Sequence, residues 1–231
     1  MSEPIKVDVW SDIACPWCYI GKRKFEEGVR RFAASASSPD AGSGEAPAVE
    51  VTYHSFELAP DTPVDFEGSE VDFLAHHKGL PEEQVHQMLE RVTGIAASVG
   101  LEYDFSSVRH TKTLKAHQVL HLAKAHGLQL EVAERLFRAY FVEGRHVGHD
   151  AELAELAAEA GLDRDEVLAA LADGRFAGDV EADIAQARAY GINGVPFYVL
   201  EGRYGVSGAQ DPEVFANALR QVAAERAEVA S

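Results

Sequence analysis

The chain has 231 residues, of which 46% are hydrophobic and 26% are charged, as in an ordinary soluble globular protein that can build a sizeable core. Its 38 acidic and 21 basic side chains give a formal net charge of −17, which argues against nucleic acid or an anionic membrane as partner. No apolar run reaches the ~18 residues of a membrane span, and residues 1–4 lack the features of a secretory signal, so we expect a cytoplasmic protein.

Residues 5–9 alternate between apolar and polar side chains, which predicts a β-strand. A pair of cysteines separated by proline and tryptophan follows this strand: Cys15-Pro16-Trp17-Cys18. Because proline suits the first turn of a helix, Cys15 is expected at the N-terminus of a helix that continues to about residue 33. Cys18 then lies one turn later on the same face, and thiols at this spacing can close a disulfide.

These two residues are the only cysteines of the sequence. The unpaired N–H groups and the dipole of a helix start favour the thiolate of Cys15, so we expect an exposed, reactive nucleophile there. A C-x-x-C pair beside a strand–helix pattern in a cytoplasmic chain is typical of a redox motif. The alternatives are two inert core thiols or half of a zinc site, for which the chain has no second cysteine pair.

The next elements predict a βαβ unit followed by a long helical block. Residues 35–48 are rich in Ser, Gly, Pro and Ala, which is typical of a flexible loop, and residues 49–54 alternate as a second strand. Strand, helix and strand at this spacing predict a right-handed parallel βαβ unit. Helical periodicity then predicts helices over residues 74–78, 82–99, 113–125, 130–141, 151–160, 165–172 and 180–190.

The C-terminal part returns to β-structure. Residues 192–200 read as an apolar strand, Glu201-Gly202 as a two-residue turn, and residues 203–206 as the returning strand of a hairpin. A last helix is expected from Asp211. Pro196 is either an ordinary trans proline that opens an edge strand or a cis proline beside the cysteines. In the second case the backbone of the preceding residue, Val195, would be free to pair with a substrate chain.

These features together resemble the DsbA-like branch of the thioredoxin superfamily over nearly the whole chain. The resemblance is closest to FrnE-type oxidoreductases, whose relatives include 2-hydroxychromene-2-carboxylate isomerases and kappa-class glutathione transferases. Four strings carry it: Cys15-Pro16-Trp17-Cys18, Gly194-Val195-Pro196-Phe197, Ser207-Gly208-Ala209-Gln210 and, more weakly, Leu136-Phe137-x-Ala139-Tyr140-Phe141. The chain departs from many relatives at Lys112-Thr113, where they have Asn-Thr, and from the isomerases and transferases at Cys15, where they typically have Ser.

The resemblance implies an α/β thioredoxin fold, a central mixed β-sheet flanked by helices, with a large all-helical insertion. We therefore expect residues 1–66 and 179–231 to form the thioredoxin-like domain and residues 67–178 to form the inserted subdomain. The resemblance also implies roles for individual residues: Cys15 is the nucleophile, Cys18 the resolving thiol and Pro196 the cis proline, and the substrate is bound by Pro16, Trp17, Gly194 and Val195.

The expected activity is to reduce, form or isomerise disulfides of protein substrates through a mixed disulfide at Cys15. The expected partners are protein thiols, protein disulfides or glutathione; no cofactor and no metal are expected, and the chain is expected as a monomer or homodimer. Two alternatives stay open: a glutathione-dependent isomerase or transferase acting on a small aromatic substrate, and a non-enzymatic chaperone or interaction module. Neither needs a second thiol, so the Cys18 position counts against both.

Ten histidines raise the hypothesis of a metal site. His117 and His121 are four residues apart on one helix face, and His146 and His149 lie close together in the sequence. None stands in a recognised metal motif with a carboxylate, so we interpret them as core or surface histidines. The alternative is a zinc ion shared by the two cysteines and histidines of the insertion.

Overall fold

The computed structural model describes residues 3–36 and 46–230, and in these residues the chain forms four strands and nine helices. In chain order they are β1 (Ile5–Ser11), α1 (Pro16–Ala36), β2 (Val49–Ser55), α2 (Glu70–Lys78), α3 (Glu82–Ser98), α4 (Leu114–Ala125), α5 (Gln129–Phe141), α6 (Asp150–Glu159), α7 (Arg164–Ala172), α8 (Ala177–Ala189), β3 (Phe197–Leu200), β4 (Tyr204–Ser207) and α9 (Pro212–Ala230). Most of the loop expected over residues 35–48 lies outside the described residues. None of the described helices has the length and apolar character needed to cross a membrane.

The four described strands form one mixed sheet in the order β2-β1-β3-β4. β1 runs parallel to β2 and antiparallel to β3, and β3 runs antiparallel to β4. The register places Val7 opposite Val51 on one side and Leu200 on the other. The parallel strand–helix–strand unit expected from residues 5–54 is therefore present, with α1 as its helix.

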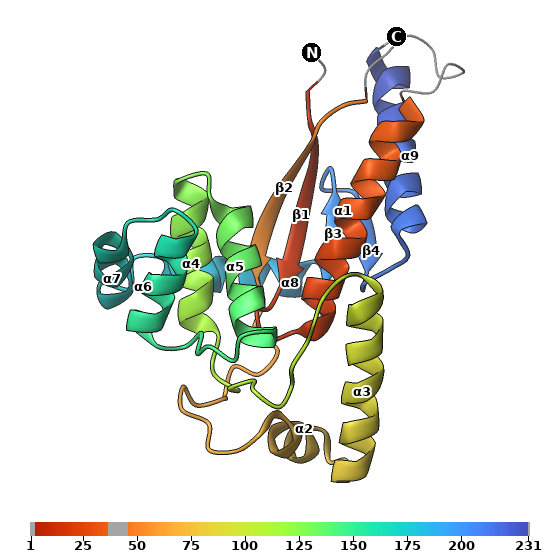
Figure 1. Cartoon of the computed structure of the whole chain (residues 1–231). Helices are drawn as coiled ribbons and strands as arrows, with labels where there is room; N and C mark the ends of the chain where they lie inside the picture. The colour runs from red at the N-terminus through yellow and green to blue at the C-terminus, as the bar shows by residue number, and fades with distance from the viewer. Residues whose placement is uncertain (1–2, 37–45, 231) are drawn as a thin grey trace.

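The alternation along β1 divides the core between the two faces of the sheet. Ile5, Val7 and Val9 are buried with apolar side chains of α1 and α9, among them Phe25 and Phe215. The side chain of Trp10, on the other face, packs with residues of α8 and the segment after it. Figure 1 shows α1 and α9 side by side along one face of the sheet, with both chain termini at the same end of the molecule.

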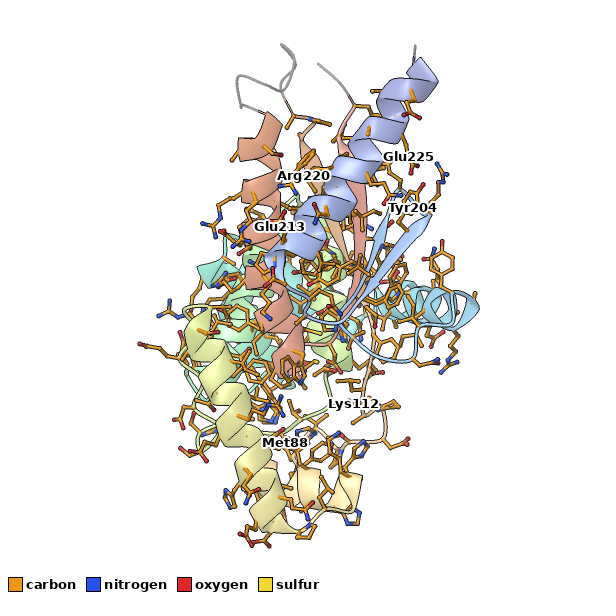
Figure 2. All side chains as sticks on the ribbon, turned by 90° about the vertical axis from the view of Figure 1, so that its right-hand side faces the viewer. Met88, Lys112, Tyr204, Glu213, Arg220 and Glu225 are labelled. Carbon is orange, nitrogen blue, oxygen red and sulfur yellow. The ribbon has the colours of Figure 1, made fainter. Side chains whose placement is uncertain are left out.

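The hairpin at the edge of the sheet has a longer loop than the sequence predicted. The prediction of a two-residue turn at Glu201-Gly202 is wrong, because β4 begins at Tyr204 and the loop spans residues 201–203. Glu201 remains attached to β1: its N–H donates to the Lys6 carbonyl at 2.9 Å and its carboxylate accepts the Lys6 N–H at 2.7 Å. Figure 2 shows how α9 covers this hairpin, where the hydroxyl of Tyr204 donates to Glu225.

Two other boundaries also differ from the expectation. The strand expected over residues 192–200 is confined to Phe197–Leu200, because Pro196 lacks the N–H that a ladder position requires. Helix α2 starts at Glu70 and not at Leu74. Ser69 caps it: its hydroxyl accepts the Asp72 N–H at 3.1 Å, and the Asp72 carboxylate accepts the Ser69 N–H at 2.7 Å.

The helices from α2 to α7 lie between β2 and α8 in the chain, and α3 and α5 pack directly against α1. The largest buried cluster joins Cys15, Cys18 and Tyr19 of that start to apolar side chains of α3, α4, α5, α6 and α7. The ring of Tyr19 stacks on that of Phe137 with centroids 5.1 Å apart. In Figure 1, α2 and α3 extend beyond the sheet on the side where α1 begins. The two cysteines therefore lie where the sheet meets the helical block.

Candidate active site

The two cysteines are placed by the junction between β1 and α1. The N–H of Cys15 donates to the Asp12 carbonyl at 3.1 Å, which closes a turn after the strand, and α1 begins with Pro16. The N–H of Cys18 donates to the Cys15 carbonyl at 3.0 Å. Both side chains are free thiols. Their placement one turn apart at the helix start agrees with the sequence prediction.

The expectation that Cys15 is exposed is wrong. Only 3% of Cys15 and 2% of Cys18 is accessible, because the start of α1 is covered by the helical block and by the segment before β3. The Cys15 thiol lies 3.6 Å from the Val195 carbonyl oxygen, to which it donates. Cys15 also lines a cavity of about 500 Å³. Cys15 therefore lies at the wall of a cavity and not on an open surface.

The environment distinguishes Cys18 from Cys15. Burial raises the pKa of the Cys18 thiol well above its usual value, and the adjacent Cys15 raises it further. The Ser11 hydroxyl and the Asp12 backbone oppose this effect but do not outweigh it. A thiol whose pKa is raised in this way keeps its proton at neutral pH.

The segment before β3 closes over the dithiol from the other side. The peptide bond between Val195 and Pro196 is cis, and Pro196 is buried while Gly194 is exposed. The Pro196 carbonyl accepts the N–H of Gly208 at 2.8 Å. Gly21 in α1 permits this packing, because a Cβ there would lie 2.9 Å from Pro196 Cγ. The structure thus brings this segment against the helix that carries the cysteines.

Pro16 and Trp17 form part of the cavity wall beside Cys15. The hydroxyl of Tyr103 donates to the Pro16 carbonyl at 2.8 Å and ties the first residue of α1 to the helical block. Trp17 is 38% exposed and Leu58, on the same cavity, is 43% exposed. Exposed apolar side chains of this size are suited to contact an incoming substrate.

Asp12 is a site residue to which the sequence assigned no role. Its buried carboxylate accepts the N–H of Leu58 at 2.8 Å and that of Ala14 at 3.3 Å, and lies 3.4 Å from Nε2 of His117. Burial alone would raise the pKa of Asp12, but His117, the Leu58 N–H and Thr113 together lower it below its usual value. The ionised carboxylate of Asp12 thus connects the turn before Cys15 to the segment after β2.

The histidines do not form the zinc site considered from the sequence. His117 faces Asp12, whereas Nε2 of His121 lies 3.0 Å from Asp183, so this pair is divided between two contacts. Among the described residues, the one group of possible metal ligands contains neither cysteine and consists of Asp65, His146 and His149. Both ring nitrogens of His146 already have protein partners: Nδ1 accepts the Gly148 N–H, and Nε2 lies 3.2 Å from the Val64 carbonyl oxygen.

Comparison with known proteins gives likenesses over nearly the whole chain. A family model described as a DSBA-like thioredoxin domain matches residues 6–220. The uncharacterized protein YwbO of Bacillus subtilis (strain 168) is 29% identical over 219 residues, covering 93% of this chain and 96% of YwbO. The crystal structure of SCO1869, a probable DsbA oxidoreductase from Streptomyces coelicolor, is 40% identical with a TM-score of 0.82, covering 94% of this chain and 89% of that chain. The cytosolic disulfide reductase DsbM from Pseudomonas aeruginosa, solved with GSH, has a TM-score of 0.57 at 19% identity, covering 94% and 98% of the two chains.

Proposed function

Because this chain belongs to the DSBA-like thioredoxin domain family, we propose that it is a thiol–disulfide oxidoreductase that works through Cys15 and Cys18. One observation carries the proposal: Cys15 faces a cavity, while Cys18 lies one turn behind it in the buried first turn of α1. In this arrangement Cys15 would contact a substrate first, and Cys18 would react only with the mixed disulfide formed at Cys15. It supports Cys15 as the nucleophile and Cys18 as the resolving thiol.

In the reducing direction, the thiolate of Cys15 attacks one sulfur of a substrate disulfide. The substrate S–S bond breaks, and a mixed disulfide joins Cys15 to the sulfur that it attacked. The other substrate sulfur leaves as a thiolate and takes a proton. Cys18 then loses its proton and attacks Sγ of Cys15, which releases the second substrate thiolate. Two electrons pass to the substrate, and the protein is left with a disulfide between its two cysteines.

The protein is reset by an external thiol. We propose glutathione or a protein dithiol as the donor: its thiolate attacks the Cys15–Cys18 disulfide, and a second donor thiol resolves the mixed disulfide. The two electrons come from the donor, which is itself oxidised to a disulfide. The reverse sequence oxidises substrate thiols, so the direction depends on the potential of the surrounding thiols.

The segment that precedes β3 is proposed to hold the substrate chain. The Val195 carbonyl lies 3.6 Å from Sγ of Cys15, so a substrate backbone paired along residues 194–195 would place its sulfur beside the nucleophile. Exposed Trp17 and Leu58 would contact its apolar side chains. Pro196 fixes the conformation of this segment against α1.

We propose that the protein works in the cytoplasm as a reductase or disulfide isomerase. The likeness to the cytosolic reductase DsbM, whose structure contains GSH, supports both this compartment and glutathione as redox partner. Thiols are kept reduced in the cytoplasm, so net disulfide formation would be opposed there.

The test is reduction of insulin disulfides with glutathione as donor, for the wild type and for two variants. Cys15→Ser is expected to abolish turnover, and Cys18→Ser is expected to accumulate a mixed disulfide that mass spectrometry maps to Cys15. Turnover that survives Cys15→Ser would refute the proposal and favour a non-enzymatic role. Stable glutathione binding that survives Cys18→Ala, without insulin reduction, would favour a glutathione-dependent isomerase or transferase.

A further inference from the structure

The cavity beside Cys15 has the size and lining of a small-molecule site. Its volume of about 500 Å³ lies within the range of about 300–1,000 Å³ that is usual for such sites. It is lined by the first turn of α1, the segment after β2, helices α2 and α3, and the segment between α3 and α4. Figure 2 labels Met88, one of the lining residues from α3. Much of the wall is apolar: Trp17, Phe73, Leu74, Met88, Val92 and Phe105.

The cavity wall contains two basic side chains that have no acidic partner among the described residues. The net charge of the protein is −17, yet Lys78 and Arg91 line the cavity, and neither makes an ion pair with a described residue. The two carboxylates in the wall, Asp12 and Glu70, each lie against an imidazole, at 3.4 and 2.9 Å. Because each carboxylate lies against an imidazole and not against Lys78 or Arg91, these two cations are available to a negative group of a ligand.

One buried polar atom in the wall lacks a partner. Nδ1 of His110 is held by the Glu70 carboxylate at 2.9 Å, and the ring stacks on Phe73 with centroids 3.3 Å apart. The His110 side chain is 5% exposed, and its Nε2 has no hydrogen-bond partner among the described residues. Since His110 lines the cavity, a ligand can supply the missing partner. A ligand hydroxyl suits Nε2, because a hydroxyl can either donate or accept a hydrogen bond.

From these observations we propose that the cavity binds the body of a small thiol or disulfide with three features. These are an apolar, preferably aromatic, part that fits the wall, a carboxylate for Lys78 and Arg91, and a hydroxyl for Nε2 of His110. The inference rests on the proposed function, because the sulfur of this substrate is the atom that Cys15 attacks. It adds a low-molecular-mass substrate class to the protein disulfides proposed above.

Binding is tested without any thiol chemistry, on the Cys15→Ser variant, with three matched probes followed by ligand-observed NMR. The probe 3-(4-hydroxyphenyl)propionate carries all three features; its amide lacks the charge, and 3-phenylpropionate lacks the hydroxyl. A charged contact and a buried hydrogen bond each predict a preference of about tenfold for the complete probe over the incomplete one. Equal or undetectable binding of all three probes would overturn the inference.

Two cavity variants and a control assign these preferences to residues. Arg91→Gln, at an exposed position, should reduce the preference for the carboxylate, and His110→Gln should reduce the preference for the hydroxyl. Arg164→Gln on α7 is the matched control, because Arg164 does not line the cavity. Preferences that persist in Arg91→Gln would contradict the assigned site even if the His110 variant fails to fold.

Protection of Cys15 links the cavity to the proposed reaction. In the Cys18→Ser variant, the complete probe should slow alkylation of Cys15 by iodoacetamide, and the amide at the same concentration should do so less. Binding without protection would overturn the claim that this ligand is a substrate of Cys15. Failure of insulin reduction with intact binding and protection would instead refute the proposed function, so the two failures are distinguishable.

Discussion

Sγ of Cys15 lies 3.6 Å from the carbonyl oxygen of Val195, although 180 positions separate the two residues in the chain. The contact brings the start of α1 against the segment that enters β3. Under the proposed function, a substrate sulfur bonded to Cys15 would lie beside the backbone of residues 194–195. We expect reactivity at Cys15 to depend on this contact, and two residues beside the dithiol are expected to maintain it.

Gly21 is the first of these. A Cβ at this position would lie 2.7 Å from the Tyr198 hydroxyl and 2.9 Å from Pro196 Cγ, so Gly21→Ala must push α1 away from the Pro196 segment. We expect Gly21→Ala to lower the free energy of unfolding by about 1–3 kcal/mol and to reduce insulin turnover. Urea denaturation and the insulin assay measure the two effects.

The matched control is Gly94→Ala in α3. A Cβ at Gly94 meets no atom within 4 Å, and the residue is exposed in a helix. Alanine there should raise the free energy of unfolding by about 0.5–1 kcal/mol. Equal effects of the two substitutions would show that Gly21 is not required for the packing of Pro196.

Asp12 is expected to stabilise the turn before Cys15. Asp12→Asn removes the charge that faces His117 and leaves one oxygen to serve both the Leu58 and Ala14 N–H groups, so we expect a loss of about 1–3 kcal/mol in unfolding free energy. The control is Asp163→Asn, because asparagine caps a helix as well as aspartate does. A thermal melt in which Asp12→Asn matches the wild type would contradict this role.

His54 is expected to make the protein less stable at alkaline pH. Burial alone would lower the pKa of His54, but Asp183 at 2.7 Å and Asp8 at 2.8 Å raise it from 6.5 to about 8. The charged ring therefore stabilises the fold fully below pH 6.5, and this contribution is lost as the pH rises through 8. We expect a loss of about 2 kcal/mol across this window, measured by urea denaturation. A His54→Gln variant that shows the same loss would contradict the assignment.

Glu134 gives a dependence of opposite sign at acidic pH. Burial opposes ionisation of its carboxyl, but Arg23, Lys22 and Tyr19 bond to it and lower its pKa from 4.5 to about 2. Its contribution is therefore present above pH 4.5 and is lost as the pH falls through 2. Because the group is partly exposed, we expect about 2 kcal/mol, measured as the acid-dependent decrease in unfolding free energy that Glu134→Gln lacks. If the unfolding free energies of the wild type and Glu134→Gln decreased equally on acidification, the assignment of this effect to Glu134 would be wrong.

The parts of the structure that depend on local pattern were predictable from the sequence. The alternation of residues 5–9 and the position of Pro16 located the strand, the helix start and the cysteine spacing. The DsbA-like resemblance and the α/β thioredoxin fold with a large helical insertion are confirmed. The start of α2 was missed although Ser69 and Asp72 form a capping box, because the apolar periodicity of that helix is weak.

The burial of Cys15 and the polar contacts around it could not be predicted in this way. Cys15 is covered by segments that are distant in the sequence, and no pattern near residue 15 reports their approach. The pairing of Glu70 with His110 spans 40 positions and joins a helix start to a segment without regular structure. The spacing of His117 and His121 suggested a shared ligand, but their side chains contact Asp12 and Asp183 separately.

The central claim is that Cys15 and Cys18 interconvert between a dithiol and a disulfide. The most direct measurement equilibrates the protein in a series of glutathione redox buffers, traps its thiols and determines the products by mass spectrometry. The account predicts a single cooperative two-electron transition, with a midpoint near or below the cytosolic glutathione poise of about −220 to −260 mV. A stable glutathione adduct on Cys15 with no internal disulfide at any buffer ratio would contradict it.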